Sequence, residues 1–230
     1  VFYDGSSINF YSSGGGCINT ALSVIVDHEY GHHLVDVAGS GQGAYGEGMG
    51  DVMGVLITGD DELARGFYSN DCINGIRTAN NNQQYPCSGR IHDCGQLISG
   101  CVWDTLATME ASYPGEAHSI VSTLAINAMM MHSGGSINDS ITLDWLVLDD
   151  NDGDLDNGTP HAAQINAGFA MHNMDYDIPM PEIYISYPNG RPSLFDPYGG
   201  TKVAINADVN TSPPIETGYG YWNTGSGWQQ

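Results

Sequence analysis

Residues 20–36 read TALSVIVDHEYGHHLVD, and this segment has the pattern of an amphipathic helix. Thr20 is a favourable N-cap residue, apolar residues follow it at helical spacing, and the glycine-rich stretch 39–43 ends the pattern. We therefore predict a helix over residues 20–36. His28 and His32 lie one turn apart within it, so both imidazoles share one helix face and can reach the same metal ion.

These two histidines form the H-E-x-x-H pattern of zinc sites, where catalytic zinc takes a third protein ligand and keeps one position for water. Glu47, at the start of a second predicted helix over residues 47–57, is the candidate third ligand. Asp51 follows one turn later on the same face, where it can orient a ligating histidine. Glu29 is the candidate general base and acid, taking a proton from zinc-bound water and returning it to a leaving amine.

The remaining pattern predicts more helices, a disulfide-pinned loop and a β-rich end. Helices are expected over residues 95–112, 116–132 and from about His161 to His172, with Thr159 and Pro160 as N-cap and first helical residue. Residues 70–88 are polar and predict a surface loop. The glycines at positions 46, 48 and 50 predict close packing of the second helix against the first.

Two domains are expected. Residues 1–16 alternate aromatic and polar groups, which predicts an edge hairpin able to bind an extended peptide. After residue 178 the prolines 179 and 181 break the helical pattern, and residues 183–185 and 203–205 read as short strands. We predict a catalytic domain over 1–178 and a β-rich segment over 179–230, the start of an immunoglobulin-like or β-sandwich module or strands packed on the first domain.

Several motifs, in chain order, resemble the gluzincin zinc metallopeptidases, most closely the fungalysin and thermolysin-like families. Residues 2–10 (FYDGSSINF) are similar to their substrate-binding edge strand, residues 28–32 (HEYGH) to their zinc helix, and residues 46–51 (GEGMGD) to the fungalysin third-ligand motif. Asp36 also fits, and the resemblance covers roughly residues 1–112. It implies an α+β, thermolysin-like zincin domain with a small mixed sheet and a mainly helical lower part, followed here by a short all-β segment.

The resemblance also implies further site residues. Residues 91–96 (IHDCGQ) resemble the fungalysin stretch that carries the histidine donor to the oxyanion, which implies His92 in that role. Residues 156–161 (DNGTPH) resemble the run before the donor histidine of thermolysin, so His161 is an alternative donor, or else a helix-capping residue. Residues 75–77 resemble the arginine-bearing segment of the family, which implies that Arg77 binds a substrate carbonyl.

Composition excludes some partners. Lys and Arg total 5 against 27 Asp and Glu, and a net charge of −22 repels phosphate backbones and anionic lipid surfaces. The apolar runs are shorter than the roughly 20 residues of a bilayer span. We therefore expect no nucleic acid and no membrane insertion, and a monomeric protein.

The five cysteines lie in loop-like stretches without close C-x-x-C pairs, which predicts disulfides and an oxidising compartment. Cys72 is expected to pair with Cys87 or Cys94. The chain begins at Val1 without a methionine or an apolar leader, which predicts a segment processed from a larger precursor. The protein is accordingly expected to be secreted or displayed at a cell surface.

An acidic turn offers a second metal candidate. Asp150, Asp152 and Asp154 alternate around Gly153, a spacing that can turn several oxygens toward calcium, although a solvated acidic turn has the same pattern.

The sequence therefore predicts a secreted zinc endopeptidase that cleaves a polypeptide bound in extended conformation. Two alternatives remain: a catalytically silent zincin-fold binding or adhesion module, and a zincin that acts on glycopeptides.

Overall fold

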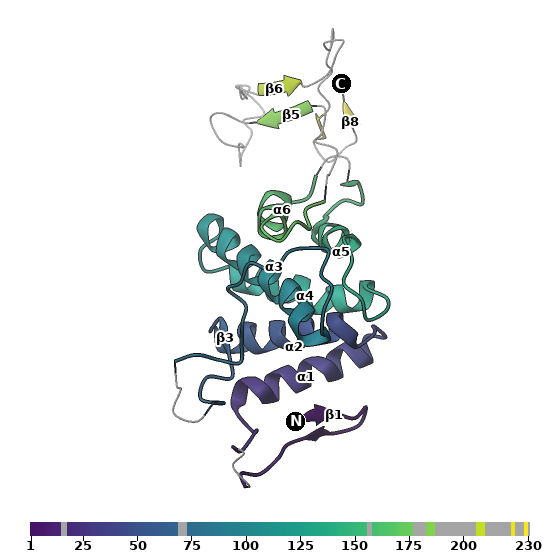
Figure 1. The fold of residues 1–230 in the computed structure, drawn as a ribbon. Coiled ribbons are helices and arrows are strands. Elements are labelled where there is room, and N and C mark those ends of the chain that lie inside the picture. Colours follow the sequence, from purple (N-terminus) through teal and green to yellow (C-terminus); the bar gives the residue numbers. More distant parts are fainter. Residues whose placement is uncertain are drawn as a thin grey trace. The chain divides into compact units, whose positions relative to one another are not determined.

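Helices make up most of the first part of the chain (Figure 1). The computed structural model describes residues 1–14, 18–68, 73–155 and 158–176, and the backbone of four short strands beyond them. The chain divides into two units, Val1–Asp177 and Ile178–Gln230, at a boundary one residue from the expected one. The helices described are α1 (Ser23–Val37), α2 (Gly43–Thr58), α3 (Ile91–Ser112), α4 (Ala117–Met131), α5 (Ser140–Asp149) and α6 (Ala162–Ala170).

The strands form antiparallel pairs. In the first unit β1 (Phe2–Tyr3) pairs with β2 (Ile8–Asn9), and β3 (Glu62–Leu63) pairs with β4 (Arg77–Thr78). The described part of this unit therefore has two separate antiparallel pairs of two-residue strands, and not the one small mixed sheet that the resemblance implies. In the second unit β5 (Ile183–Ser186) pairs with β6 (Asn206–Val209), and β7 (Trp222–Asn223) with β8 (Trp228–Gln229). The predicted strand 203–205 lies outside the described residues.

Helix α2 is the central element of the first unit. Its residues from Tyr45 to Leu56 are all buried, and it packs against α1 on one side and α3 on the other. Figure 1 shows α1 between this helix and the N-terminal hairpin. A helix that is buried on every side can hold polar groups only where they find partners, which makes Glu47 and Asp51 on α2 notable.

Glycines allow both close helix contacts. A Cβ on Gly31 would lie 2.7 Å from the Cα of Gly50, so α1 and α2 touch through their backbones at this point. On the other side, a Cβ on Gly48 would lie 2.7 Å from the carbonyl oxygen of Gly95 on α3. The predicted close packing of the second helix against the first is therefore confirmed, although not all three of glycines 46, 48 and 50 face α1. Only Gly50 does so, because successive even positions turn by about 200° around a helix.

Helix ends differ from the expected ones. Helix α1 begins at Ser23, and the Thr20 hydroxyl accepts a hydrogen bond from the Tyr11 amide (2.8 Å) instead of capping it. Helix α3 begins four residues earlier than expected, which places His92 in its first turn. Helix α6 begins at Ala162, after the predicted cap. Helix α5 was not predicted from the sequence, because its apolar residues are spread around the helix and lack a helical period.

The structure joins Cys87 to Cys94. The expected pairing of Cys72 with one of these two residues was therefore wrong, and Cys72 itself lies outside the described residues. Cys101 is free and buried. In the described part of the chain, no helix combines the length and the apolar composition that crossing a bilayer requires.

Candidate metal centre

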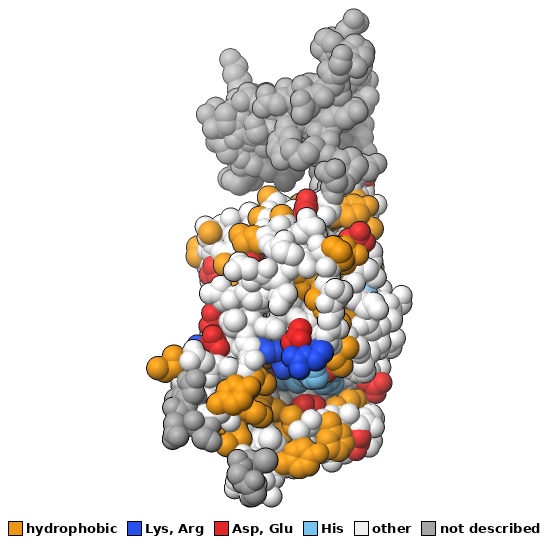
Figure 2. Space-filling view, viewed as in Figure 1, with side chains coloured by type: hydrophobic (Ala, Val, Ile, Leu, Met, Phe, Trp, Pro, Cys, Tyr) orange, Lys and Arg blue, Asp and Glu red, His pale blue; other side chains and the backbone are white. Residues whose placement is uncertain are grey.

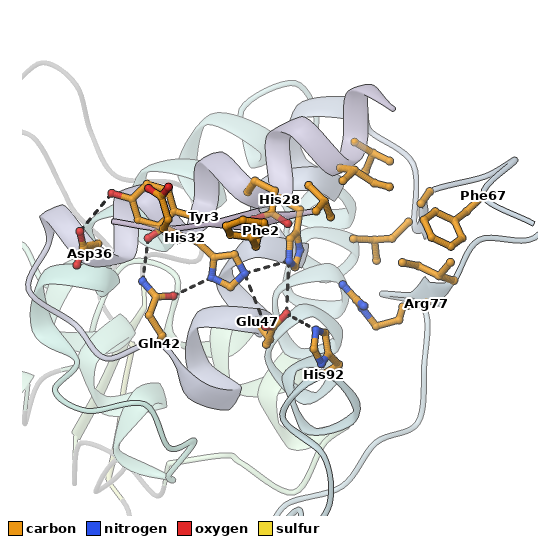
Figure 3. Close-up of a pocket in the computed structure, with 18 of the residues that line it drawn as sticks. Phe2, Tyr3, His28, His32, Asp36, Gln42, Glu47, Phe67, Arg77 and His92 are labelled. Atoms are coloured by element: carbon orange, nitrogen blue, oxygen red, sulfur yellow. Dashed lines mark hydrogen bonds and ion pairs between the residues drawn. The ribbon is translucent and has the colours of Figure 1, made fainter. Parts of the chain in front are cut away.

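Helices α1 and α2 bring His28, His32 and Glu47 together (Figure 3). The Nε2 atoms of the two histidines lie 3.1 Å apart. Glu47 Oε2 lies 3.4 Å from His28 Nε2, and Glu47 Oε1 lies 3.7 Å from His32 Nε2. Within the described ranges, this is the one group of three or more His, Cys, Asp or Glu residues whose ligand atoms all lie within 4.8 Å of one another.

The donor set fits a divalent transition metal ion. Glu47 is buried, and its Oε2 atom makes no well-aligned hydrogen bond, although His28 Nε2 and His92 Nε2 lie 3.4 and 3.3 Å from it. A buried carboxylate is costly unless positive charge neutralises it, and a bound cation would do so. Two imidazole nitrogens and one carboxylate also form one of the ligand sets of catalytic zinc sites. These three side chains can therefore hold zinc and leave a coordination position for water.

Asp51 links His28 to Arg77. Asp51 Oδ1 lies 2.8 Å from His28 Nδ1, although the approach is bent and the ring nitrogen has no well-aligned hydrogen bond. Arg77 donates to both carboxylate oxygens of Asp51, from Nε at 2.8 Å and from the Nη2 amine at 2.6 Å. The fully buried carboxylate thus has a cationic partner and an imidazole partner.

Burial and neighbouring charges set the ionisation of the cluster. Burial alone would lower the pKa of His28, but contacts with the carboxylates of Asp51 and Glu47 raise it to about 9. Burial would raise the pKa of Asp51, but His28 and Arg77 hold it below its usual value. Burial also acts to raise the pKa of Glu47, but the neighbouring histidines, first among them His28, outweigh burial, so the pKa lies below its usual value. Both carboxyl groups are therefore kept in the charged form, which for Glu47, the candidate ligand, is the form that binds a metal.

His32 has a different partner. Burial, followed by the charge of His28, lowers the pKa of His32. Its Nδ1 atom lies 2.7 Å from Gln42 Oε1, and Gln42 Nε2 donates to the His32 carbonyl oxygen at 3.0 Å. The Nδ1 atom of His28 thus faces the carboxylate of Asp51, and the Nδ1 atom of His32 faces the neutral amide of Gln42.

The cluster opens into a cavity of about 700 Å³. Figure 2 shows this face, where histidine side chains lie directly beside Lys or Arg side chains at a hollow of the surface, with hydrophobic side chains close by. Glu29 lines the cavity and is only 4% exposed. One end is apolar and is formed by Val24, Ile25, Leu63, Ala64, Phe67 and Ile76.

The N-terminal hairpin supplies another part of the wall. Phe2 and Tyr3 of β1 both line the cavity. The Tyr3 hydroxyl lies 2.9 Å from His33 Nδ1 and donates to Asp36 Oδ2 at 3.2 Å, which fastens the hairpin to α1. Figure 3 shows Asp36 and Gln42 on one side of the histidines and Arg77 with Phe67 on the other.

Of the two candidate oxyanion donors, the structure brings only His92 to this cavity. His92 Nε2 lies 3.3 Å from Glu47 Oε2, and its side chain is 53% exposed. His161 is not among the residues that line the cavity. Its Nδ1 atom lies 2.6 Å from Asp149 Oδ1 of α5, and its ring packs edge-on against Tyr113, the residue after α3, so these two residues hold it elsewhere in the unit.

The acidic turn does not gather its carboxylates into a comparable cluster within the described residues. Asp150 Oδ2 accepts from the Gly153 amide (2.6 Å), and Asp152 Oδ1 accepts from the Asp154 amide (3.0 Å). Asp156, the next carboxylate of the run, lies outside the described residues. Calcium at this turn stays a prediction.

Gln42 and Tyr3 contact site residues and were not singled out from the sequence. Gln42 lies ten residues beyond His32, between two glycines, and no spacing rule connects such a residue with a helix before the turn. Tyr3 lies within the stretch that resembles an edge strand, but its hydroxyl contact with α1 depends on how the hairpin folds back. Both contacts arise from tertiary structure.

Comparisons of the chain with protein-family models, with curated proteins and with solved structures give no match.

Proposed function

We propose that this protein is a secreted zinc-dependent endopeptidase of the gluzincin type. The observation that carries the proposal is the convergence of His28, His32 and Glu47 on one point of a cavity that Glu29 also lines. Zinc held by these three side chains would polarise a substrate carbonyl and activate a water molecule for attack. The resemblance of residues 28–32 and 46–51 to gluzincin motifs supports the same proposal.

Glu29 is the proposed general base and acid. It adjoins His28 on α1, it is buried, and it lines the cavity beside the ligand set. A carboxylate there accepts a proton from the attacking water and returns it to the leaving nitrogen of the peptide bond. Geometry supports this assignment, since a proton-transfer group must lie within reach of the reacting atoms.

His92 and Arg77 are the proposed groups that contact the substrate. The exposed imidazole of His92 stands at the cavity wall, where it can donate to the oxygen of the carbonyl under attack. Arg77 lines the same cavity, and its guanidinium is hydrogen-bonded to Asp51. The guanidinium held in this way would donate a hydrogen bond to a second carbonyl of the substrate. Both groups would donate hydrogen bonds to carbonyl oxygens of the substrate.

The cavity suits a chain bound in extended form. The β1 strand borders the cavity and pairs with β2 on one side, which leaves backbone groups for an added strand. The apolar end near Phe67 accepts an uncharged side chain. We therefore propose a polypeptide as the substrate.

A cleavage assay with a zinc-loaded protein tests this proposal. Wild-type protein and Glu29→Gln are incubated with casein and with a peptide library, after the zinc content of each has been measured. We expect cleavage by the wild type and a loss of at least about 100-fold in Glu29→Gln at equal zinc content, the scale of general acid–base catalysis.

Two results would contradict the assignment. Equal cleavage by wild type and by Glu29→Gln would show that Glu29 does not act in peptide hydrolysis. Zinc-loaded wild type that cleaves no peptide would instead favour a silent binding module, or a glycopeptide substrate if glycosylated peptides are cleaved.

A further inference from the structure

We propose that Gln42 is a positioning residue for His32. Its side-chain amide holds the imidazole in the tautomer whose Nε2 lone pair faces His28 and Glu47. The inference deepens the proposed metal site and rests on it for its consequence, which is the affinity for the ion. The orientation of the ring can be tested without any metal.

The direction of the amide follows from its two contacts (Figure 3). Gln42 Nε2 lies 3.0 Å from the His32 carbonyl oxygen, which can only accept a hydrogen bond. The NH₂ group must therefore face the carbonyl, which leaves Oε1 to face His32 Nδ1 at 2.7 Å. An amide oxygen cannot donate, so Nδ1 carries the proton, and a neutral ring then has its lone pair on Nε2.

That nitrogen is the one aimed at the ligand cluster. His32 Nε2 lies 3.1 Å from His28 Nε2 and 3.7 Å from Glu47 Oε1. A metal-binding histidine needs a deprotonated nitrogen toward the ion, and the partner of its other nitrogen fixes both tautomer and ring orientation. Gln42 fills this role for His32 with a neutral group, whereas Asp51 faces His28 with a charged one.

The backbone of Gln42 is fixed by packing. The amide of Gly41 donates to the Gly134 carbonyl and that of Tyr45 donates to the Gly135 carbonyl, both at 3.1 Å. Any Cβ on Gly41 or Gly43 would overlap this loop between α4 and α5. Gln42 is the N-cap residue of α2, but its side chain makes no capping bond and reaches across to α1 instead.

Gly46 keeps the space for the amide open. A Cβ at position 46 would lie 2.6 Å from Gln42 Oε1. The residue directly before the ligand Glu47 therefore has no side chain at the place where Gln42 holds His32. Gly46→Ala should displace the amide without touching Gln42 itself, and alanine favours helix more than glycine, so the fold should persist.

The experiment uses the 230-residue chain with Gln42→Leu or Gly46→Ala, substitutions that remove or displace the amide. Gln42→Glu is the conservative variant, because it keeps an acceptor for the Nδ1 proton. Gln84→Leu is the matched control, since it removes another amide-to-carbonyl bond (Gln84 Nε2 to Met171 O, 2.7 Å) at a residue that does not line the cavity.

Two measurements are made. Long-range ¹H–¹⁵N spectra of the metal-free proteins at pH 8 report which ring nitrogen of His32 is protonated. Competition with a chelator gives the affinity for Zn²⁺ and Co²⁺. We expect protonated Nδ1 in the wild type, Gln42→Glu and Gln84→Leu, and loss of that preference in Gln42→Leu and Gly46→Ala with about 10- to 100-fold weaker metal binding.

Failure of the inference is distinct from failure of the proposed function. Folded Gln42→Leu with unchanged tautomer and unchanged affinity would overturn the role of Gln42. Wild type with protonated Nδ1 but no metal binding would uphold the role of Gln42 in orienting the ring and overturn the zinc site.

Discussion

Asp51 is the residue through which the buried cluster is joined to the cavity wall. It contacts His28 on one side and is held by a two-point bond from Arg77 on the other. Because a carboxylate behind a ligating histidine raises its basicity and fixes its ring, the metal affinity that we propose for this site should depend on this contact. His28 is thereby connected to the one Arg side chain that lines the cavity among the described residues.

We predict that Asp51→Asn weakens Zn²⁺ binding by about 10- to 100-fold, as measured by chelator competition. Asparagine keeps the shape of the side chain but removes its charge. The matched control is Asp60→Asn, which breaks a two-point bond of the same kind between Asp60 and Arg65 on the surface. Equal affinities for Asp51→Asn and Asp60→Asn would contradict the role of Asp51.

The meeting of the three candidate ligands was the part of the site geometry that the sequence predicted best. Helical spacing placed His28 and His32 on one face, and the structure brings Glu47 from the next helix to them. Helical spacing could not predict the contact between Gln42 and His32, because the position of Gln42 depends on the packing of glycines 41 and 43 against the loop at 134–135.

At the scale of elements, the contact between α1 and α2 decides whether the ligands meet. Gly31 lies on α1 within one turn of both histidines, and its partner Gly50 lies between Glu47 and Asp51 on α2. A Cβ on Gly50 would also lie 2.7 Å from the His28 ring. Close approach of the two backbones thus sets the separation of the ligands.

Gly31→Ala is predicted to destabilise the protein by about 1–3 kcal/mol, the usual cost of overpacking, despite the better helix propensity of alanine. Its Cβ would lie 2.7 Å from backbone, which has no room to move aside. Gly46→Ala is the comparison within the same helix pair, because it meets only the end of a side chain. Chemical denaturation measures both, and equal stability of the two variants would contradict the account.

The start of α3 is held by the bond between Cys87 and Cys94, seven residues apart. The bond closes a loop that contains His92. Closing a loop of this length stabilises a fold by about 2 kcal/mol in the chain-entropy description. We predict a lower melting temperature for Cys87→Ser than for wild type, and a smaller fall on adding a thiol reductant to the variant than to wild type. A wild-type melting temperature that reductant leaves unchanged would contradict this.

Helix ends were harder to predict than helices. The sequence pattern predicts that α1 exists. It also predicts Thr20 as the cap, because serine and threonine favour that position, but the Thr20 hydroxyl accepts a hydrogen bond from the Tyr11 amide instead. Helix α5 has apolar residues on every side, and its partners in the fold decide that it is helical.

At the scale of the whole molecule, the first unit carries its own core and the whole candidate site. Residues from α1, α2 and the β3–β4 pair form a hydrophobic cluster that includes Val24, Ile25, Val55 and Leu63. Each of the ligands lies within Val1–Asp177. The sequence indicated this boundary through the prolines at 179 and 181, but the strand pairing beyond it depends on contacts that no local pattern predicts.

We predict that a chain ending at Asp177 unfolds cooperatively and binds Zn²⁺ within about threefold of the affinity of the 230-residue chain, a difference below 1 kcal/mol. The physical reason is that core, ligands and cavity belong to one unit. Circular dichroism and chelator competition measure the two properties. A truncated protein that is unfolded would show that the first unit needs the remaining residues.

The central claim is that one zinc ion binds between α1 and α2. It is tested most directly by a crystal structure of the zinc-loaded protein, with anomalous difference maps collected on both sides of the zinc absorption edge. We predict one peak per chain at about 2.0–2.2 Å from His28 Nε2, His32 Nε2 and a Glu47 oxygen. A peak with Glu47 more than about 4 Å away, well beyond a Zn–O bond, or no peak at these residues, would contradict the account.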